Sequence, residues 1–300
     1  MSSSIQTRFA NAVHRIRRVK SKLQYAEIGP YRLRLAADSQ IPNYRKAFHL
    51  YDTALGRIAG VLRSKYPALH AIDIGANVGD TSALIRQTGE IPVLCVEGDP
   101  TILPILAENV TRLGPGVVVE PSFVGKDGDA VSLDLADEVG SNASLVKAID
   151  SRGSVRLRSL RAILGDHPLF KSAKLLKIDT EGFDFDIIRE SIDFIERSKP
   201  AVFFEYDPHF RPDKPCAGLE TIETLIHIGY SDFIYYDNFG NFLLHSDATN
   251  RLIFSDLNSY LASNRKYGVA VYYFDICALH REDTALVPEI RSCTQVFSGS

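Results

Sequence analysis

A short glycine turn between two apolar runs is the part of this sequence best suited to chemistry. Residues 71–74 read as a buried strand, and the turn that follows, 75–79, has a glycine at each end. About one helix length later, a second apolar run at 93–96 is followed by Glu97. Glycines let a backbone approach a ligand closely, and an acid at the tip of the second strand can accept hydrogen bonds from both hydroxyls of a ribose. The pattern predicts the first half of a nucleotide-type cofactor site.

The turn differs from the dinucleotide-binding fingerprint. Gly75 and Gly79 are separated by Ala-Asn-Val, and no third glycine follows. A pyrophosphate needs a bare, amide-lined helix start, whereas here Asp73 ends the strand and Asp80 falls in the first turn of the next helix. Two acids at this place suit a cofactor that carries an amine or a sulfonium group. The sequence therefore favours S-adenosylmethionine over NAD.

Acidic residues also end the later strands of the pattern. Asp179 ends the strand expected over 174–179, and Glu181 follows it. Glu205 ends the next expected strand, and His209 lies close behind it. Each acid alone could be a helix N-cap, but caps do not explain several acids at one edge of a sheet, where ligands bind. We predict that these four side chains include the base that removes a proton from an acceptor group.

A metal ion is an alternative means of activating an acceptor hydroxyl. Asp179, Glu205 and Asp207 supply carboxylate oxygens, which suit a hard cation such as Mg²⁺. The sequence provides these ligand types without their geometry. We therefore assign no metal site, and name these three residues as the ligands if Mg²⁺ takes part.

An alternation of strands and helices must position these residues. Beyond the runs above, we expect further elements along the chain: helices at 100–112, 161–164, 185–197 and 219–228, strands at 117–120, 200–205 and 269–278, and a hairpin over 232–245. This order predicts an α/β fold, a doubly wound, mostly parallel, Rossmann-like sheet with antiparallel C-terminal edge strands. The polar segment 136–154 reads as a lid loop.

The N-terminal part of the chain reads as a helical extension, residues 1–66, ahead of a Rossmann-like domain over 67–300. We expect a basic amphipathic helix at 5–23 and a second helix at 44–65. Residues 1–34 carry a net charge of +7, which leaves −10 for the remainder. The basic helix could lie on an anionic membrane surface, serve as an organellar presequence, or pack on the rest of the protein.

Composition is that of an ordinary globular protein, with 45% hydrophobic and 24% charged residues. The four cysteines are widely spaced with no CxxC pair, and Cys95 and Cys277 fall in apolar runs, so we expect buried free thiols in a reducing compartment. No apolar run reaches the length of a membrane span, and no secretory signal is visible. We therefore expect a cytoplasmic protein.

Several short motifs occur together along the chain. They lie at 72–79, 96–97, 159–164, 176–182 and 204–205. This set resembles the FkbM family of S-adenosylmethionine-dependent methyltransferases, whose most specific mark is the Lys-Ile-Asp-x-Glu-Gly block at 177–182. The resemblance covers roughly residues 44–280. It implies a class I methyltransferase fold and O-methylation of a hydroxyl on a sugar, a glycan or a polyketide.

The resemblance also implies where the cofactor binds. The residues concerned are Asp73, Gly75, Ala76, Asn77, Gly79, Glu97, Gly98 and Phe123. Glu97 would bind the ribose, and Phe123 would lie near the adenine. The chain departs from the family at two places: it has Glu-Gly-Asp-Pro at 97–100 where the family often has Glu-Pro, and Ser-Phe-Val-Gly at 122–125 where a small residue and an aspartate are common.

Three other classes of protein remain to be compared. A nucleotide-sugar oxidoreductase should show the full glycine fingerprint and a hydride-site motif such as Tyr-x-x-x-Lys, and neither is present. A nucleic-acid methyltransferase needs a basic, aromatic-lined surface, whereas the expected catalytic region is acidic. A non-catalytic module of the same fold stays open. We expect a small-molecule or glycan acceptor, no nucleic acid, and peripheral membrane contact only through the basic helix; the oligomeric state stays open.

Overall fold

The computed structural model describes residues 24–37, 39–134, 144–147, 154–180, 182–210 and 215–294. The expected basic helix at 5–23, Glu181 and most of the expected lid lie outside these residues.

Eight strands form the main sheet, in the order β12-β11-β13-β10-β9-β3-β4-β5. Their bounds are β3 (Ala71–Ile74), β4 (Val93–Val96), β5 (Val117–Glu120), β9 (Leu175–Ile178), β10 (Ala201–Tyr206), β11 (Tyr230–Asp237), β12 (Phe242–Asp247) and β13 (Phe274–His280). The strands from β5 to β10 pair in parallel. β13 enters antiparallel between β10 and β11, and β12 is the antiparallel edge. The sheet is therefore doubly wound and mostly parallel, and its strand order reverses between β3 and β9, where such sheets bind ligands.

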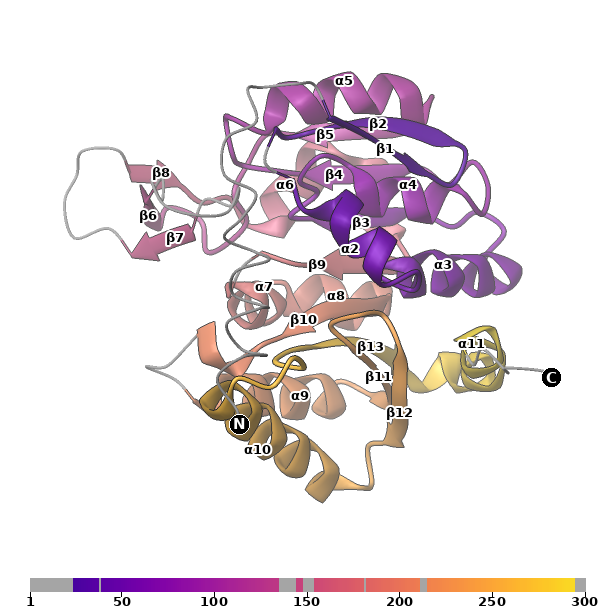
Figure 1. The fold of residues 1–300 in the computed structure, drawn as a ribbon, viewed down its shortest axis with the longest axis vertical. Coiled ribbons are helices and arrows are strands. Elements are labelled where there is room, and N and C mark those ends of the chain that lie inside the picture. The colour runs from indigo at the N-terminus through magenta and orange to yellow at the C-terminus, as the bar shows by residue number, and fades with distance from the viewer. Residues whose placement is uncertain are drawn as a thin grey trace, which may run out of the picture.

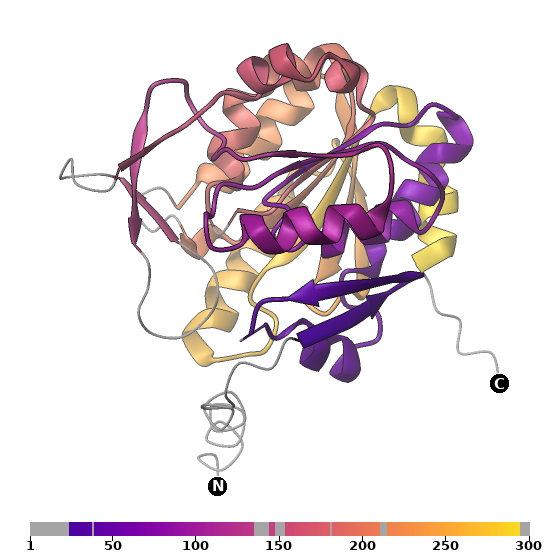
Figure 2. The same cartoon turned by 90° about the horizontal axis from the view of Figure 1, so that it is seen from above.

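Helices cover both faces of this sheet (Figures 1 and 2). One face packs against α6 (Leu160–Asp166), α7 (Asp184–Glu190), α8 (Ile192–Ser198), α9 (Ala217–His227) and α10 (Arg251–Tyr267). The other packs against α3 (Thr53–Lys65), α4 (Asp80–Arg86), α5 (Leu103–Leu113) and α11 (Val287–Thr294). The result is the three-layer α/β architecture that the alternating pattern predicts.

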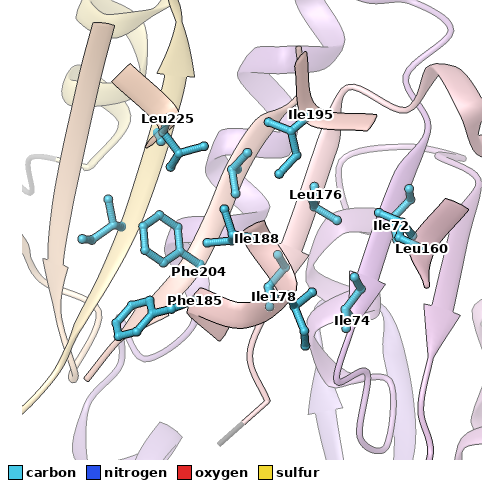
Figure 3. Close-up of a cluster of buried hydrophobic side chains, with 14 of the residues drawn as sticks. Ile72, Ile74, Leu160, Leu176, Ile178, Phe185, Ile188, Ile195, Phe204 and Leu225 are labelled. Atoms are coloured by element: carbon cyan, nitrogen blue, oxygen red, sulfur yellow. The ribbon is translucent and has the colours of Figure 1, made fainter. Parts of the chain in front are cut away.

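The central strands are buried on both faces, which explains their continuous apolar sequences. Ile74 and Ile178 point into the first helical layer with Phe204, as Figure 3 shows. Because side chains alternate along a strand, Asp73 and Lys177 point to the opposite face. Asp73 is the charged residue of β3 and Lys177 that of β9, and both are almost completely buried.

The N-terminal region is not purely helical. β1 (Gln24–Ile28) and β2 (Tyr31–Leu35) form an antiparallel hairpin, in which the Arg34 amide donates to Asn109 of α5. The helix expected at 44–65 is two helices, α2 (Ile41–Ala47) and α3, separated by residues 48–52. Asp52 has a left-handed backbone with φ +58°, which no continuous right-handed helix can contain.

Other elements differ from expectation in detail. The helix expected at 185–197 is divided at Ser191 into α7 and α8, and α10 was not expected. A small sheet of β6 (Ala130–Asp134), β7 (Ser144–Lys147) and β8 (Ser154–Arg156) projects from one side of the molecule (Figure 1). The described ranges also contain three short 3₁₀ helices: η1 (Pro168–Ser172), η2 (Pro208–Phe210) and η3 (Arg281–Leu286).

Two expectations about the whole chain can be compared with the structure. Cys95 and Cys277 are buried free thiols. None of the helices in the described ranges has the length and apolar character needed to cross a bilayer.

Candidate active site

The glycine turn after β3 needs backbone conformations that most side chains oppose. Gly75, Asn77 and Gly79 all have positive φ, at +73°, +46° and +86°. A Cβ atom on Gly75 would lie 1.9 Å from the carbonyl oxygen of Asp179, so the turn and the end of β9 touch through bare backbone. Ala76, expected among the cofactor-binding residues, is buried in the core with no exposed surface.

Asp73 lies beneath this turn rather than in it. Its carboxyl has no exposed surface, and its Oδ2 accepts hydrogen bonds from Thr81 Oγ1 at 2.7 Å and Ser82 Oγ at 2.6 Å. These bonds tie the first turn of α4 to β3. Direct contact with a cofactor, as expected for Asp73, is not available to a buried carboxyl; its role is to fix the turn.

Lys177 is a site residue that sequence reasoning missed. Its Nζ donates to the carbonyl oxygen of Gly75 at 2.8 Å and lies 3.2 Å from Asp73 Oδ1 and 3.6 Å from Asp179 Oδ2. Burial alone would lower the pKa of Lys177, but the surrounding carboxylates raise it above its ordinary value, so the side chain is a cation. The sequence feature that could have indicated this role is a lysine inside an otherwise apolar strand. Lys177 joins the turn to the acid after β9.

Glu97 completes the turn from the end of β4. Its Oε2 accepts a hydrogen bond from the Asn77 amide at 2.8 Å, and its Oε1 accepts one from the Asp99 amide at 2.8 Å. Burial raises the pKa of Glu97, and these backbone hydrogen bonds oppose that rise. Because each carboxylate oxygen can accept more than one hydrogen bond, Glu97 keeps acceptor capacity for a ligand.

Gly98 and Phe123 form a close contact beside Glu97. A Cβ atom on Gly98 would lie 2.3 Å from the Phe123 ring, so only glycine leaves room for that ring at the end of β4. The ring is half-buried. An acid with spare acceptor capacity beside a flat apolar ring fits the ribose and the base of an adenosyl group. The residues present therefore fit S-adenosylmethionine.

Asp179 and Glu205, two of the acids predicted from the sequence, lie at the carboxyl ends of β9 and β10. The Asp179 side chain is 48% exposed. Glu205 pairs across strands with Asp275 of β13, and it is half-buried. Asp179 follows Ile178, which pairs with Phe204, so the two acids stand in neighbouring register positions of β9 and β10. The structure thus brings Asp179 and Glu205 together.

His209 and Asp207 are occupied by structural contacts. Asp207 is 3% exposed, and its Oδ1 accepts a hydrogen bond from the His209 amide at 2.8 Å. His209 Nε2 lies 3.3 Å from the carbonyl oxygen of Leu261 in α10, which makes Nε2 the donor. Among the residues that the structure describes, no group of three or more His, Cys, Asp and Glu side chains could hold a metal ion. The proposed set of Asp179, Glu205 and Asp207 is therefore corrected, because Asp207 faces its own loop.

Comparison with known proteins shows which protein family this chain belongs to. The model of the methyltransferase FkbM domain matches residues 73–241, more than half of the chain. The chain belongs to the FkbM methyltransferase family. The match begins at Asp73 and includes Lys177, Asp179 and Glu205, so it contains the candidate site described above. This FkbM-family protein is an S-adenosylmethionine-dependent methyltransferase.

Solved structures resemble this FkbM protein at low sequence identity. The FkbM methyltransferase from Methylobacillus flagellatus is 18% identical, with a TM-score of 0.38, over 56% of this chain and 40% of its own. The S-adenosylmethionine-dependent methyltransferase from Agrobacterium tumefaciens is 8% identical, with a TM-score of 0.43, over 88% of this chain and 72% of its own. The O-methyltransferase TomG from Streptomyces achromogenes is 14% identical, with a TM-score of 0.37, over 75% and 79%. Among curated proteins, none matches this chain.

Proposed function

We propose that this FkbM-family protein methylates a hydroxyl of a sugar, a glycan precursor or a related natural product. The observation that carries the proposal is the exposed carboxyl of Asp179 at the end of β9, one strand from the glycine turn. An alcohol must lose its proton when its oxygen takes a methyl group, and a carboxylate within reach of that oxygen can accept it. Glu205, in the neighbouring register position, and Glu181 are the other candidates for this base.

The contacts of the glycine turn indicate how the cofactor binds in this proposal. When bound, S-adenosylmethionine supplies an electrophilic methyl group. Glu97 would accept hydrogen bonds from the ribose hydroxyls, and Phe123 would flank the adenine. Lys177 holds the turn and Asp179 in a fixed relation, which serves catalysis by fixing where the two reactants meet.

The acceptor in this proposal is a small molecule or a glycan rather than a nucleic acid. The supporting observation is charge: residues beyond 34 carry a net charge of −10, and acids gather at the carboxyl edge of the sheet. A nucleic-acid substrate would be repelled by that edge. The net charge of +7 on residues 1–34 supports a further role in holding the enzyme near an anionic membrane surface.

Two measurements test the proposal. The first is calorimetric titration of the purified protein with S-adenosylhomocysteine, with NAD⁺ and NADP⁺ as controls. Micromolar binding of the first compound alone is expected, and silence from all three would favour a non-catalytic module. The second is transfer of a labelled methyl group to a panel of methyl glycosides, with the product's linkage read by mass spectrometry. An ether at a sugar oxygen is expected, and a methylated nitrogen or carbon would overturn O-methylation.

A further inference from the structure

The hairpin β1–β2 packs one face on the protein and exposes the other. Leu33 points inward and is buried, whereas Tyr25 and Arg32 lie on the outward face and are exposed. The buried Asn109 of α5 holds the hairpin in place, because it accepts from the Arg34 amide at 2.8 Å and donates to the Arg34 carbonyl oxygen at 2.7 Å. The hairpin lies on the outside of the molecule beside α5 (Figures 1 and 2). Its outward face is therefore a fixed part of the surface.

Residues of the hairpin and of α5 line an open pocket of about 470 Å³, which we call the arginine pocket. Its lining residues are Tyr25, Pro30, Tyr31, Arg32 and Arg112. The guanidinium carbon Cζ of Arg32 lies 4.8 Å from the centre of the Tyr25 ring, and that of Arg112 lies 5.9 Å from it. A guanidinium that rests on an aromatic face still directs its planar N–H groups outward, where they match the oxygens of a phosphate or a carboxylate. The pocket therefore has the chemistry of an anion site.

Positive charge exceeds negative charge around the arginine pocket. Arg112 and Arg34 share one carboxylate, since Glu108 Oε1 lies 2.7 Å from Arg112 Nη2 and Oε2 lies 2.6 Å from Arg34 Nη1. Glu27 stands opposite Arg32 in the hairpin register, but Arg32 forms no ion pair with a carboxylate in the described part of the chain. Three guanidinium groups thus face two carboxylates. Arg32 is the group left to bind an anionic ligand.

The arginine pocket lies away from the candidate active site. Arg112 belongs to the last turn of α5, which leads into β5, so it lies at the amino edge of the main sheet. The glycine turn, Asp179 and Glu205 lie at the carboxyl edge. A ligand in the pocket is therefore neither the cofactor nor the acceptor. An extended anionic surface at the pocket would leave the acids of the carboxyl edge on the far side, where it repels them least.

The sequence directly before β1 adds further positive charge. Residues 1–23 contain six basic side chains and no acid: Arg8, Arg15, Arg17, Arg18, Lys20 and Lys22. Lys22 is three residues from Tyr25, so the chain itself keeps the two Cα atoms within about 11 Å. Cations beside an exposed tyrosine suit the surface of an anionic bilayer, where tyrosine rings lie at the level of the headgroups.

We propose that the arginine pocket binds the phosphate headgroup of an anionic lipid. Arg32 and Arg112 donate to the phosphate oxygens, and the Tyr25 ring holds both guanidinium groups in place. A soluble phosphate compound offers the same oxygens, but the cations before β1 extend the charge well beyond one phosphate group, which favours a membrane. The inference extends the membrane role proposed above for residues 1–34 to a folded surface, and it does not depend on methyl transfer.

The first test is co-sedimentation of the full chain with lipid vesicles. Vesicles of equimolar phosphatidylcholine and phosphatidylglycerol are the probe, and vesicles of phosphatidylcholine alone are the reference; the wild type should bind only the first. Arg32→Gln should lower the partition coefficient by about 5-fold, and Arg32→Gln/Arg112→Gln should lower it further. Lys171→Gln/Arg197→Gln removes the same charge at exposed positions in η1 and α8, on the other face of the sheet, and should bind as the wild type does.

Arg32→Lys distinguishes a pocket from diffuse attraction between charges. Lysine keeps the positive charge but lacks the planar pair of donors, so binding should fall although the net charge is unchanged. The urea midpoint of each variant is measured as a check on folding. Binding of Arg32→Lys or of Arg32→Gln equal to that of the wild type overturns the pocket and leaves the membrane role to the segment before β1. A wild type that does not bind anionic vesicles overturns both.

Two soluble probes cover the other sources of phosphate. Glycerol 3-phosphate and a short DNA duplex are titrated into the wild type and into Arg32→Gln. If Arg32→Gln loses affinity for glycerol 3-phosphate while its vesicle binding is unchanged, the pocket belongs to a soluble phosphate compound. The same result with the duplex assigns it to a nucleic acid, and either result overturns the lipid. Vesicle binding without binding of S-adenosylhomocysteine overturns the proposed methyl transfer instead and supports this inference.

Discussion

Lys177 Nζ lies 3.2 Å from Asp73 Oδ1 at adjacent positions of β9 and β3, and neither side chain is more than 3% exposed. A buried ion pair has a large desolvation penalty, so it is a poor means of stabilising a fold. Here it has another effect. The same ammonium reaches the carbonyl of Gly75 and the carboxyl of Asp179, and thereby fixes the glycine turn relative to the end of β9.

The first prediction concerns this ion pair. Lys177→Met leaves the Asp73 carboxylate buried without its cation and should reduce the free energy of unfolding by about 3–5 kcal/mol. Asp73→Asn should also destabilise, but the double variant should lose less than the sum of the two. Urea denaturation of all three variants measures this. Additive losses would show that the two groups act independently.

Glu97 provides the second prediction. Glu97→Gln replaces a charged acceptor by an amide, which weakens hydrogen bonds both to the Asn77 amide and to a ribose. The affinity for S-adenosylhomocysteine should fall by about 10- to 100-fold. Glu90→Gln, an exposed site before β4, is the matched control and should bind as the wild type does. Calorimetric titration measures both variants, and equal affinities would remove Glu97 from the cofactor site.

The parts of the site that follow from local sequence were predictable. Asp179 and Glu205 directly end apolar strands, and strand ends meet at one edge of a parallel sheet. Glu97 and the glycine turn follow from the same rule. His209 was one of four candidates for the base, because histidine often takes that role, but its ring nitrogen donates to the carbonyl oxygen of Leu261 in α10, a helix absent from the sequence-based assignment.

Residues that depend on tertiary contact were not predictable. Asp52 belongs to a segment that was expected to lie inside a helix, and its position depends on packing against the β11–β12 turn. Asp275 lies opposite Glu205 only because β13 inserts next to β10 rather than at the edge of the sheet. No local pattern in one sequence records such a pairing.

The third prediction tests the close approach at Gly75. Gly75→Ala forces a Cβ atom toward the Asp179 carbonyl in a backbone with positive φ, so it should cost more than about 2 kcal/mol and abolish S-adenosylhomocysteine binding. Gly165→Ala in α6 is the matched control, because nothing lies within 4 Å of its added Cβ. That variant should be stabilised by about 0.5–1 kcal/mol. Similar stability of the two variants would contradict the close contact.

The last prediction concerns pH and the buried carboxyl of Asp184 at the start of α7. Asp184 is 3% exposed, and burial raises its pKa from 3.8 to about 7, with the charge of Asp179 adding to the rise. Its Oδ2 accepts from the Thr180 amide and hydroxyl, while its Oδ1 has no hydrogen-bond partner among the described residues. Between pH values of about 4 and about 7, Asp184 is protonated in the folded protein but ionised in the unfolded chain. The free energy of unfolding therefore falls as pH rises through this range.

Asp184→Asn isolates that effect, because an amide keeps an acceptor for Thr180 but cannot ionise. The difference in unfolding free energy between Asp184→Asn and the wild type should shift in favour of the variant as pH rises from about 4 to about 7, and then become constant. Urea denaturation at a series of pH values measures it, with the exposed Asp193→Asn in α8 as control. The control should show no such shift over this range. A constant difference for Asp184→Asn would mean that the wild-type carboxyl is ionised throughout, held by a partner that stabilises its charge.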